Sequence, residues 1–172
     1  MFNRQSILSV VKCLQLPRVI IRRSNVMFTE NKKNGVHPVL LEHNIFIVWK
    51  PEYNLGIPII DEHHRGIVSI INSLYFGMQN NHIKDMLTSI IDMMFDYTQI
   101  HFQVEESFLE KIDYPNARKH QALHLELSTK LTETGMSSLL CEDPYQFMDF
   151  LKEWWINHIC CEDLIFRDHL LK

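Results

Sequence analysis

Residues 101–106, His-Phe-Gln-Val-Glu-Glu, decide the fold that we predict for this chain. His101 and Glu105 are four residues apart, so in an α-helix both side chains lie on one face and reach the same point. Apolar residues recur at helical spacing around them, and Met94 falls on the same face as His101. We therefore predict a helix over about 83–111 whose buried face carries an imidazole and a carboxylate.

Three further segments combine an apolar helical face with at least one histidine. The four expected helices cover about 60–80, 83–111, 115–134 and 144–171, and Gly135 is expected to end the third. In the fourth, the stripe predicted to point inward is Phe147, Leu151, Trp154, His158 and Ile165. Short connections imply antiparallel neighbours, so the predicted fold class is all-α: an antiparallel up-down-up-down four-helix bundle with an N-terminal extension.

Donor side chains fall on the core face of every one of these helices. They comprise five histidines and two carboxylates, namely His64, His101, Glu105, His120, His124, His158 and Asp163. The spacing of His120 and His124 repeats that of His101 and Glu105, whereas His158 and Asp163 are five residues apart. That last spacing requires a π-type turn or the reach of a bridging carboxylate. Burying such groups without partners would cost on the order of several kcal/mol, and a shared metal removes that cost.

The donor types restrict the metal. Imidazole with carboxylate suits Fe, Zn or Mn, and the absence of thiolate donors argues against Fe–S clusters and structural zinc. Seven ligands are too many for one ion and natural for two. If Glu105 and Asp163 bridge both ions together with an oxo or hydroxo group, three histidines complete six coordination on one ion. The two remaining histidines leave the second ion with an open position.

Four motifs in residues 46–172 resemble the hemerythrin family. Trp49, Tyr53, Gly56 and Asp61-Glu62-His63-His64 are similar to its opening W-x3-Y-x2-G…D-x-Q-H. Residues 101–106 match HFxxEE, and Tyr114-Pro115 with His120 and His124 resembles YPx4Hx3H. His158-Ile159 through Asp163 matches HIx3D. All seven ligand positions of the family are filled.

The resemblance implies a cofactor of two non-haem Fe ions with a bridging oxo or hydroxo group. His120, His124 and His158 would bind the six-coordinate iron, and His64 and His101 the iron with the open site. The implied function is reversible O2 binding for storage, delivery or sensing, without enzymatic turnover, and small anions such as azide would inhibit it. The alternative is a diiron redox enzyme that reduces peroxide or NO, or that handles iron as a ferroxidase does.

The family positions also imply an apolar wall around bound O2, formed by Ile67, Phe102, Trp154 and Ile159. Two residues depart from the family pattern. His63 replaces the usual Gln, and we interpret it as an exposed surface histidine. Trp155 replaces a leucine near the O2 pocket, where it either tightens the pocket or packs between helices and leaves the pocket unchanged.

Charge divides the chain unevenly. Residues 1–29 carry five basic and no acidic side chains, which leaves 12 basic against 21 acidic residues, a net charge of −9, for residues 30–172. An acidic bulk argues against a nucleic-acid partner. Apolar runs fall short of the roughly 20 residues that a membrane span needs, so no membrane partner is expected. The sequence leaves monomer and homo-oligomer undecided.

The N-terminal residues are predicted to form a targeting segment separate from the bundle. Residues 1–29 are free of acidic residues and place Ile7, Leu8, Val11 and Leu14 on one helical stripe, which is typical of a mitochondrial transit peptide. Residues 30–45 read as a linker to the bundle domain of residues 46–172.

Import into the mitochondrial matrix, with cleavage near Arg22 or Arg23, is therefore expected for the full chain. The measurement is the location of a C-terminally tagged chain and the N-terminus of its mature form. A purely cytoplasmic signal from a chain with an intact N-terminus would contradict import. A start at Met27, which yields a cytoplasmic form without the segment, is the competing outcome.

Overall fold

The structure, a computed structural model, describes residues 45–80 and 82–170. The predicted transit peptide, and the linker apart from Ile45, lie outside the described residues. The described elements are a short 3-10 turn and a series of helices: η2 (Pro51–Tyr53), α2 (Pro58–Gln79), α3 (Ile83–Lys111), α4 (Ala117–Cys141), α5 (Pro144–Trp154), η3 (Trp155–Glu162) and α6 (Asp163–Leu170).

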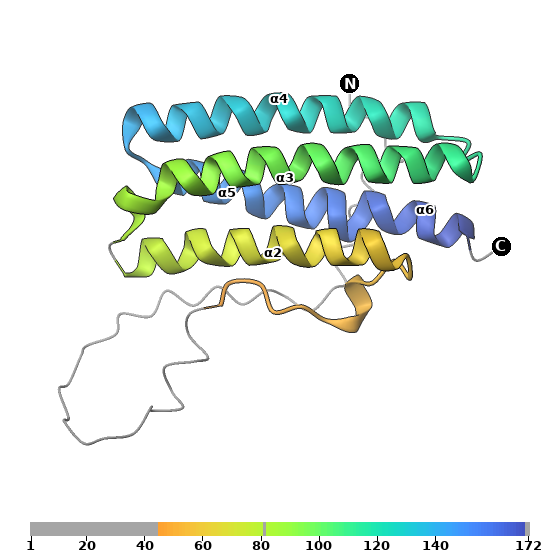
Figure 1. Cartoon of the computed structure of the whole chain (residues 1–172), viewed down its shortest axis with the longest axis horizontal. Coiled ribbons are helices and arrows are strands. Elements are labelled where there is room, and N and C mark those ends of the chain that lie inside the picture. Colours follow the sequence, from red (N-terminus) through yellow and green to blue (C-terminus); the bar gives the residue numbers. More distant parts are fainter. Residues whose placement is uncertain (1–44, 81, 171–172) are drawn as a thin grey trace, which may run out of the picture. The chain divides into compact units, whose positions relative to one another are not determined.

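The helices form the predicted all-α bundle. Consecutive helices run in opposite directions, and α5, η3 and α6 follow one another without a break as the fourth helix (Figure 1). The packing pairs are α2 with α3, α3 with α4, α4 with α5, and α5 with α2, so the four helices close around one interior. This closure brings one face of every helix, and the donors on it, towards a common axis.

The third helix is longer than predicted. It continues through Gly135 to Cys141 and ends at Glu142, whose backbone is left-handed with φ 51°. Gly135 is buried, and a Cβ there would approach the Cγ2 atom of Ile91 on α3 to 3.0 Å. The glycine therefore serves the close packing of α4 against α3, and the expectation that it ends the helix was wrong.

The fourth helix contains the irregular turn that the spacing of His158 and Asp163 requires. Residues Trp155–Glu162 are a π-helix, in which backbone hydrogen bonds join residues five apart instead of four. Each turn therefore contains more residues than a turn of an α-helix. Asp163 thereby comes onto the face of His158. The same shift makes the prediction for Ile165 wrong, because its side chain is 47% exposed and Phe166 is fully buried in its place.

The interior of the bundle is apolar around the donor residues. The largest fully buried side chains include Phe147, Phe166, Met94 and Leu151.

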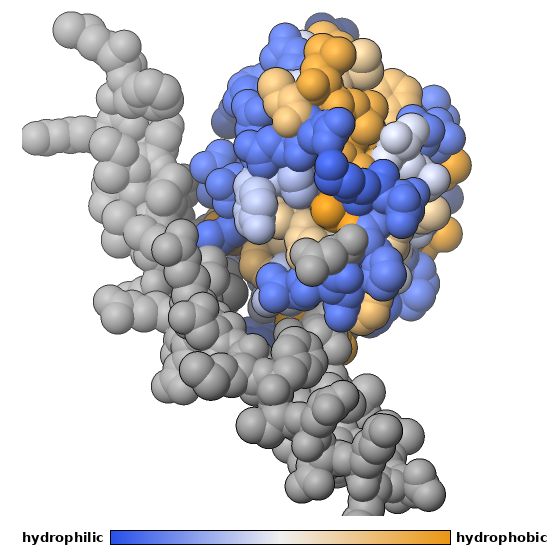
Figure 2. Space-filling view, turned by 90° about the vertical axis from the view of Figure 1, so that its left-hand side faces the viewer, coloured by the Kyte–Doolittle hydropathy of each residue, from blue (hydrophilic) through white to orange (hydrophobic). Residues whose placement is uncertain are grey.

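The space-filling view of the end with the α2–α3 and α4–α5 connections is mostly hydrophilic, with an apolar area at its top (Figure 2). In the described part of the chain, no helix is long and apolar enough to cross a membrane.

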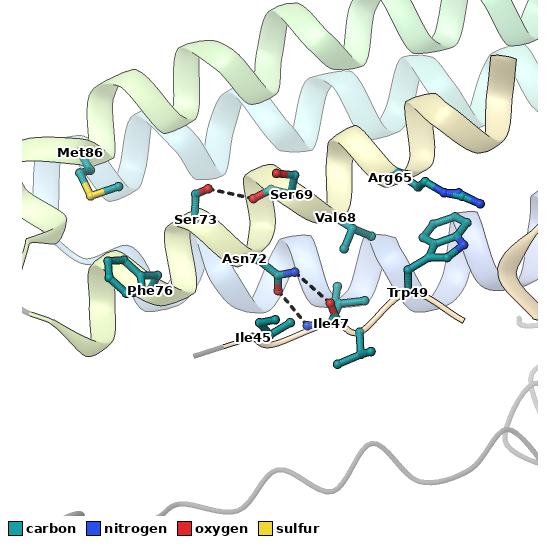
Figure 3. Close-up of a pocket in the computed structure, with 11 residues that line it drawn as sticks. Ile45, Ile47, Trp49, Arg65, Val68, Ser69, Asn72, Ser73, Phe76 and Met86 are labelled. Atoms are coloured by element: carbon teal, nitrogen blue, oxygen red, sulfur yellow. Dashed lines mark hydrogen bonds between the residues drawn. The ribbon is translucent and has the colours of Figure 1, made fainter. Parts of the chain in front are cut away.

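Residues 45–54, which include the η2 turn, form an arm along α2. The side chain of Asn72 holds it, because its Oδ1 accepts hydrogen bonds from the backbone N–H groups of Phe46 and Ile47 and its Nδ2 donates to the Ile47 carbonyl (Figure 3). Further along the arm, the guanidinium of Arg65 lies 4.6 Å from the centre of the Trp49 ring. The arm thus covers the junction of α2 with the fourth helix.

Candidate metal centre

Two groups of donor atoms meet in the interior of the bundle. The first consists of Glu105, His120, His124 and His158, and the second of His64, His101, Glu105 and Asp163. Within each group the donor atoms lie within 4.8 Å of one another, and every one of these side chains is buried. The structure therefore brings together all seven residues that the sequence singled out. The first group contains three histidines and the second contains two, and Glu105 belongs to both.

The two oxygens of Glu105 face different histidine groups. Its Oε1 lies 2.6 Å from Nε2 of His120 and 3.7 Å from Nε2 of His124. Its Oε2 lies 3.5 Å from Nε2 of His101, which belongs to the other group. Since each oxygen serves a different set of imidazoles, the carboxylate is arranged to join two neighbouring centres.

Asp163 repeats this arrangement from the opposite helix. Its Oδ1 is 3.4 Å from Nε2 of both His120 and His158, and its Oδ2 is 3.3 Å from Nε2 of His64. The π-helix makes this position available, because in a regular α-helix a residue five after His158 would turn away from it. Both carboxylates therefore span the same pair of histidine groups.

Several of these buried atoms have no hydrogen-bond partner. Both ring nitrogens of His64 and of His101, Oε2 of Glu105 and both oxygens of Asp163 are buried without one. An unsatisfied buried polar group costs on the order of 1–3 kcal/mol, so such a cluster is unfavourable unless something binds it. Neutral imidazoles and carboxylates are donors for iron, and they converge here from four helices. The residues present fit a two-metal centre.

The protonation states of four of the five histidines favour metal binding. Burial by itself would lower the pKa of the fifth, His120, but its hydrogen bond to Glu105 raises that pKa. Burial lowers the pKa of His64 to about 4 and that of His101 to about 3, so both rings are neutral near pH 7. Burial likewise lowers the pKa of His124 and His158, aided by positive charge on neighbouring histidines. Burial raises the pKa of Asp163 to about 8. A neutral Asp163 carboxyl must therefore release its proton when a cation binds.

Glu106 contacts a donor histidine, although it is not among the residues that the sequence predicted for the site. Its Oε1 lies 2.8 Å from Nδ1 of His124, so that nitrogen donates a hydrogen bond to the carboxylate. The donated proton fixes the ring so that its Nε2 presents a lone pair to the donor group. The signal was in the sequence, because Glu106 directly follows Glu105 in the motif of residues 101–106.

Apolar side chains cover both histidine groups. Phe102 stacks on His124 with ring centres 3.8 Å apart, and the edge of the Trp154 ring meets Phe102 at 6.0 Å. Ile67 and Ile159 are also buried. These four are the residues that the sequence assigned to the wall of the pocket, and their burial limits the access of water to the donors.

Trp155 lies on another side of the helix. Its ring meets the rings of Tyr53 at 5.3 Å and Trp49 at 6.0 Å, both edge-on and both from the N-terminal arm. The ring is buried, but its partners belong to the arm and not to the donor groups. This geometry favours the interpretation in which Trp155 leaves the pocket unchanged, although its ring partners lie on the arm and not on another helix of the bundle.

His63 is not an exposed surface residue, and the interpretation of it as one was wrong. It is half-buried, its Nδ1 is buried without a partner, and its ring lies 6.0 Å from that of His101 and 5.7 Å from that of Tyr97. The α2–α3 contact creates this environment, since Gly66 leaves room there for the Tyr97 ring.

A four-helix bundle with five histidines and two shared carboxylates in its interior defines a class of metal-binding helical proteins. The family model described as "Hemerythrin HHE cation binding domain" matches residues 55–170 of this chain. The chain belongs to the hemerythrin family. Membership supports a diiron O2-binding protein.

Curated relatives agree with this assignment. The bacteriohemerythrin of Stenotrophomonas maltophilia is 30% identical over 125 residues, which cover 72% of this chain and 81% of the relative. That of Clostridium acetobutylicum is 30% identical over 70% of this chain and 98% of its own length. A hemerythrin chain of Sipunculus nudus is 28% identical over 72% of this chain and 92% of its own length. All three are named as hemerythrins rather than as enzymes.

Replacing Trp155 with Leu should lower the melting temperature and leave the metal chemistry unchanged. The variant loses two edge-on ring contacts and opens a cavity, which costs about 1–3 kcal/mol of unfolding free energy. Calorimetry gives the stability, and the rates of autoxidation and azide binding report on the pocket. Trp49→Leu is the matched control, since it removes the other indole of the same contact. Faster autoxidation or azide binding in Trp155→Leu alone would place its ring at the pocket.

Metal-free protein should lose stability as the pH falls below about 6.5. His64 and His101, with pKa values of about 4 and about 3, stay neutral in the folded chain but take up protons when it unfolds. His124 and His158, whose pKa values are also lowered, add to this effect. Between their folded and unfolded pKa values the unfolded state binds more protons, so acid favours unfolding.

The raised pKa of Asp163 acts in the opposite direction, because its folded carboxyl holds a proton that the unfolded one releases above pH 4. Burial also raises the pKa of Glu106, so four histidines stand against two carboxyls, and on balance the unfolded state takes up protons near pH 5. Melting temperatures of the chelator-treated protein from pH 7 to pH 4.5 measure this uptake. A melting temperature that stays constant or rises over that interval would show that the histidines are not buried in neutral form.

Proposed function

We propose that this chain binds O2 reversibly at a centre of two non-haem iron ions that Glu105 and Asp163 bridge. One observation carries the proposal. In both Glu105 and Asp163, one carboxylate oxygen faces the three-histidine group and the other faces the two-histidine group. Two such bridges with five imidazoles supply donors for two ions and are more than one ion can use.

The unequal division of histidines gives the two positions different roles. His120, His124 and His158 complete the donor set of one ion, whereas His64 and His101 leave the second ion one donor short. A small ligand can enter only at the incomplete position. The iron pair, when bound, supplies the two electrons that O2 takes up on binding.

The surrounding side chains favour reversible binding over turnover. Ile67, Ile159 and Trp154 are buried, and Phe102 is stacked against His124, so the surroundings of the centre are apolar and limit the access of water. Water and protons are what a reduced oxygen species needs in order to leave irreversibly. Five neutral imidazoles to two carboxylates also leave more positive charge on the centre than a carboxylate-rich site does, which disfavours highly oxidised iron.

The test is to add O2 to the reduced full chain, remove it by argon sparging, and repeat this cycle. The visible absorption spectrum is recorded after each step. We expect about two iron atoms per chain and a spectrum that returns to the reduced state in each cycle. Metal analysis that gives one zinc and no iron would refute the diiron centre. Irreversible oxidation, or steady consumption of peroxide or NO, would favour the alternative function as a diiron redox enzyme.

Glu105→Ala should be the most damaging single substitution at the centre. It removes a donor from both ions and leaves their charge uncompensated, so we expect iron to fall from about two per chain to less than about one. Glu110→Ala is the matched control, because Glu110 is an exposed carboxylate further along the same helix. Iron content by elemental analysis, with melting temperature alongside, is the measurement. A Glu105→Ala protein that keeps both irons would disprove the bridging role.

A further inference from the structure

The outward face of α4 carries large apolar side chains that no helix of residues 45–80 or 82–170 covers. Leu125, Met136 and Leu140 are 72%, 54% and 81% exposed. At 100° per residue their directions on the helix fall within about 60° of one another, so they form one stripe. The apolar area at the top of Figure 2 lies over the C-terminal end of this helix. Of the ligand residues, His120 and His124 point from α4 into the interior, away from the stripe.

The middle of the stripe offers few free hydrogen-bond donors. Thr129 and Thr132 lie between its apolar ends, and their hydroxyls donate to the carbonyls of Leu125 and Ser128, each at 2.9 Å. Because both hydroxyl protons are used within the helix, this stretch needs no water as an acceptor for them. A second apolar surface can therefore cover it at little cost in lost hydration.

The charge of α4 is less negative than that of its neighbour α3. Residues 117–143 carry three basic and four acidic side chains, a net charge of −1, whereas residues 83–111 carry two basic and six acidic ones, a net charge of −4. Exposed apolar residues also occur on α3, at Met93 and Ile100, but the exposed Asp92 and Asp96 accompany them. Repulsion between two copies is therefore weaker where their α4 helices face each other than where their α3 helices do.

The ends of α4 have opposite charges. Arg118 and Lys119 stand in its first turn, and Glu142 and Asp143 follow its last residue. Glu142 is paired with Lys84 of α3 at 2.8 Å, so the contact with a second copy is assigned to Asp143. Two α4 helices placed antiparallel bring the basic end of each against the acidic end of the other. The register that sets Arg118 opposite Asp143 also sets Leu125 opposite Met136, because the two pairs have the same midpoint in the sequence. Charge and apolar contacts thus select one arrangement.

We propose that two copies of this chain associate through the outward faces of their α4 helices, packed antiparallel about a two-fold axis near Lys130. A single helix pair falls at or below the lower end of interface sizes, about 1,200 Å² in total, so the dimer is weak and depends on concentration. The contact leaves the arm and the α2 face accessible. It requires neither bound metal nor the proposed O2 function.

Sedimentation velocity of the full chain between about 5 and 500 μM tests the association. We expect a monomer–dimer equilibrium that Met136→Glu weakens at least about tenfold, since it buries a charge in the contact. Met93→Glu is the matched control, because Met93 on α3 is also 54% exposed, and it should leave the equilibrium unchanged. Iron content and melting temperature of both variants establish that they fold.

Charge reversal tests the antiparallel register. Arg118→Asp and Asp143→Arg should each weaken the dimer, and the double variant should restore it, because the exchanged charges again face each other across the two-fold axis. Melting temperatures are measured alongside, since Asp143 also caps α5 by accepting a hydrogen bond from the backbone N–H of Tyr145. Failure of the double variant to recover would overturn this arrangement. Equal weakening by Met93→Glu would move the contact away from α4. A chain that remains monomeric at 500 μM, for instance because its own N-terminal residues cover the stripe, would overturn the dimer itself.

Discussion

The sharing of two buried carboxylates between two groups of imidazoles is the constraint on which the rest of this structure depends. Five histidines and two acids lie at or near zero exposure in an apolar interior, and several of their atoms have no partner among the described residues. Such a cluster is unfavourable unless cations bind it. The four helices must therefore hold Glu105 and Asp163 from opposite sides, each aimed at both histidine groups.

Local features of the fold serve this requirement. The π-helix of residues Trp155–Glu162 adds the residue that brings Asp163 onto the face of His158. Gly66 and Gly135 allow close contacts of α2 and α4 with α3, and so set the distances between the histidine-bearing helices. The carboxylate of Glu106 orients His124 from outside the donor groups. A bundle with four regular helices and larger residues at these positions would place the same donors too far apart.

The outer surfaces of the bundle make contacts that do not involve the donor residues. The arm of residues 45–54 covers Trp155 through Trp49 and Tyr53, and Asn72 fastens it to α2. The outward face of α4 lies on the other side of that helix from His120 and His124. Because each helix gives one face to the centre, the remaining faces can vary without disturbing the donors.

The sequence by itself determined the helix count, the seven donor positions and the irregular spacing of His158 and Asp163. These follow from periodicity and spacing along one chain, which local geometry translates directly into faces of helices. It could not decide the end of α4, the direction of Ile165, or the surroundings of His63 and Trp155. Those depend on which side chains of other helices come near, and on the register shift after residue 155. Only the tertiary structure sets such contacts, because they join residues that no local pattern connects.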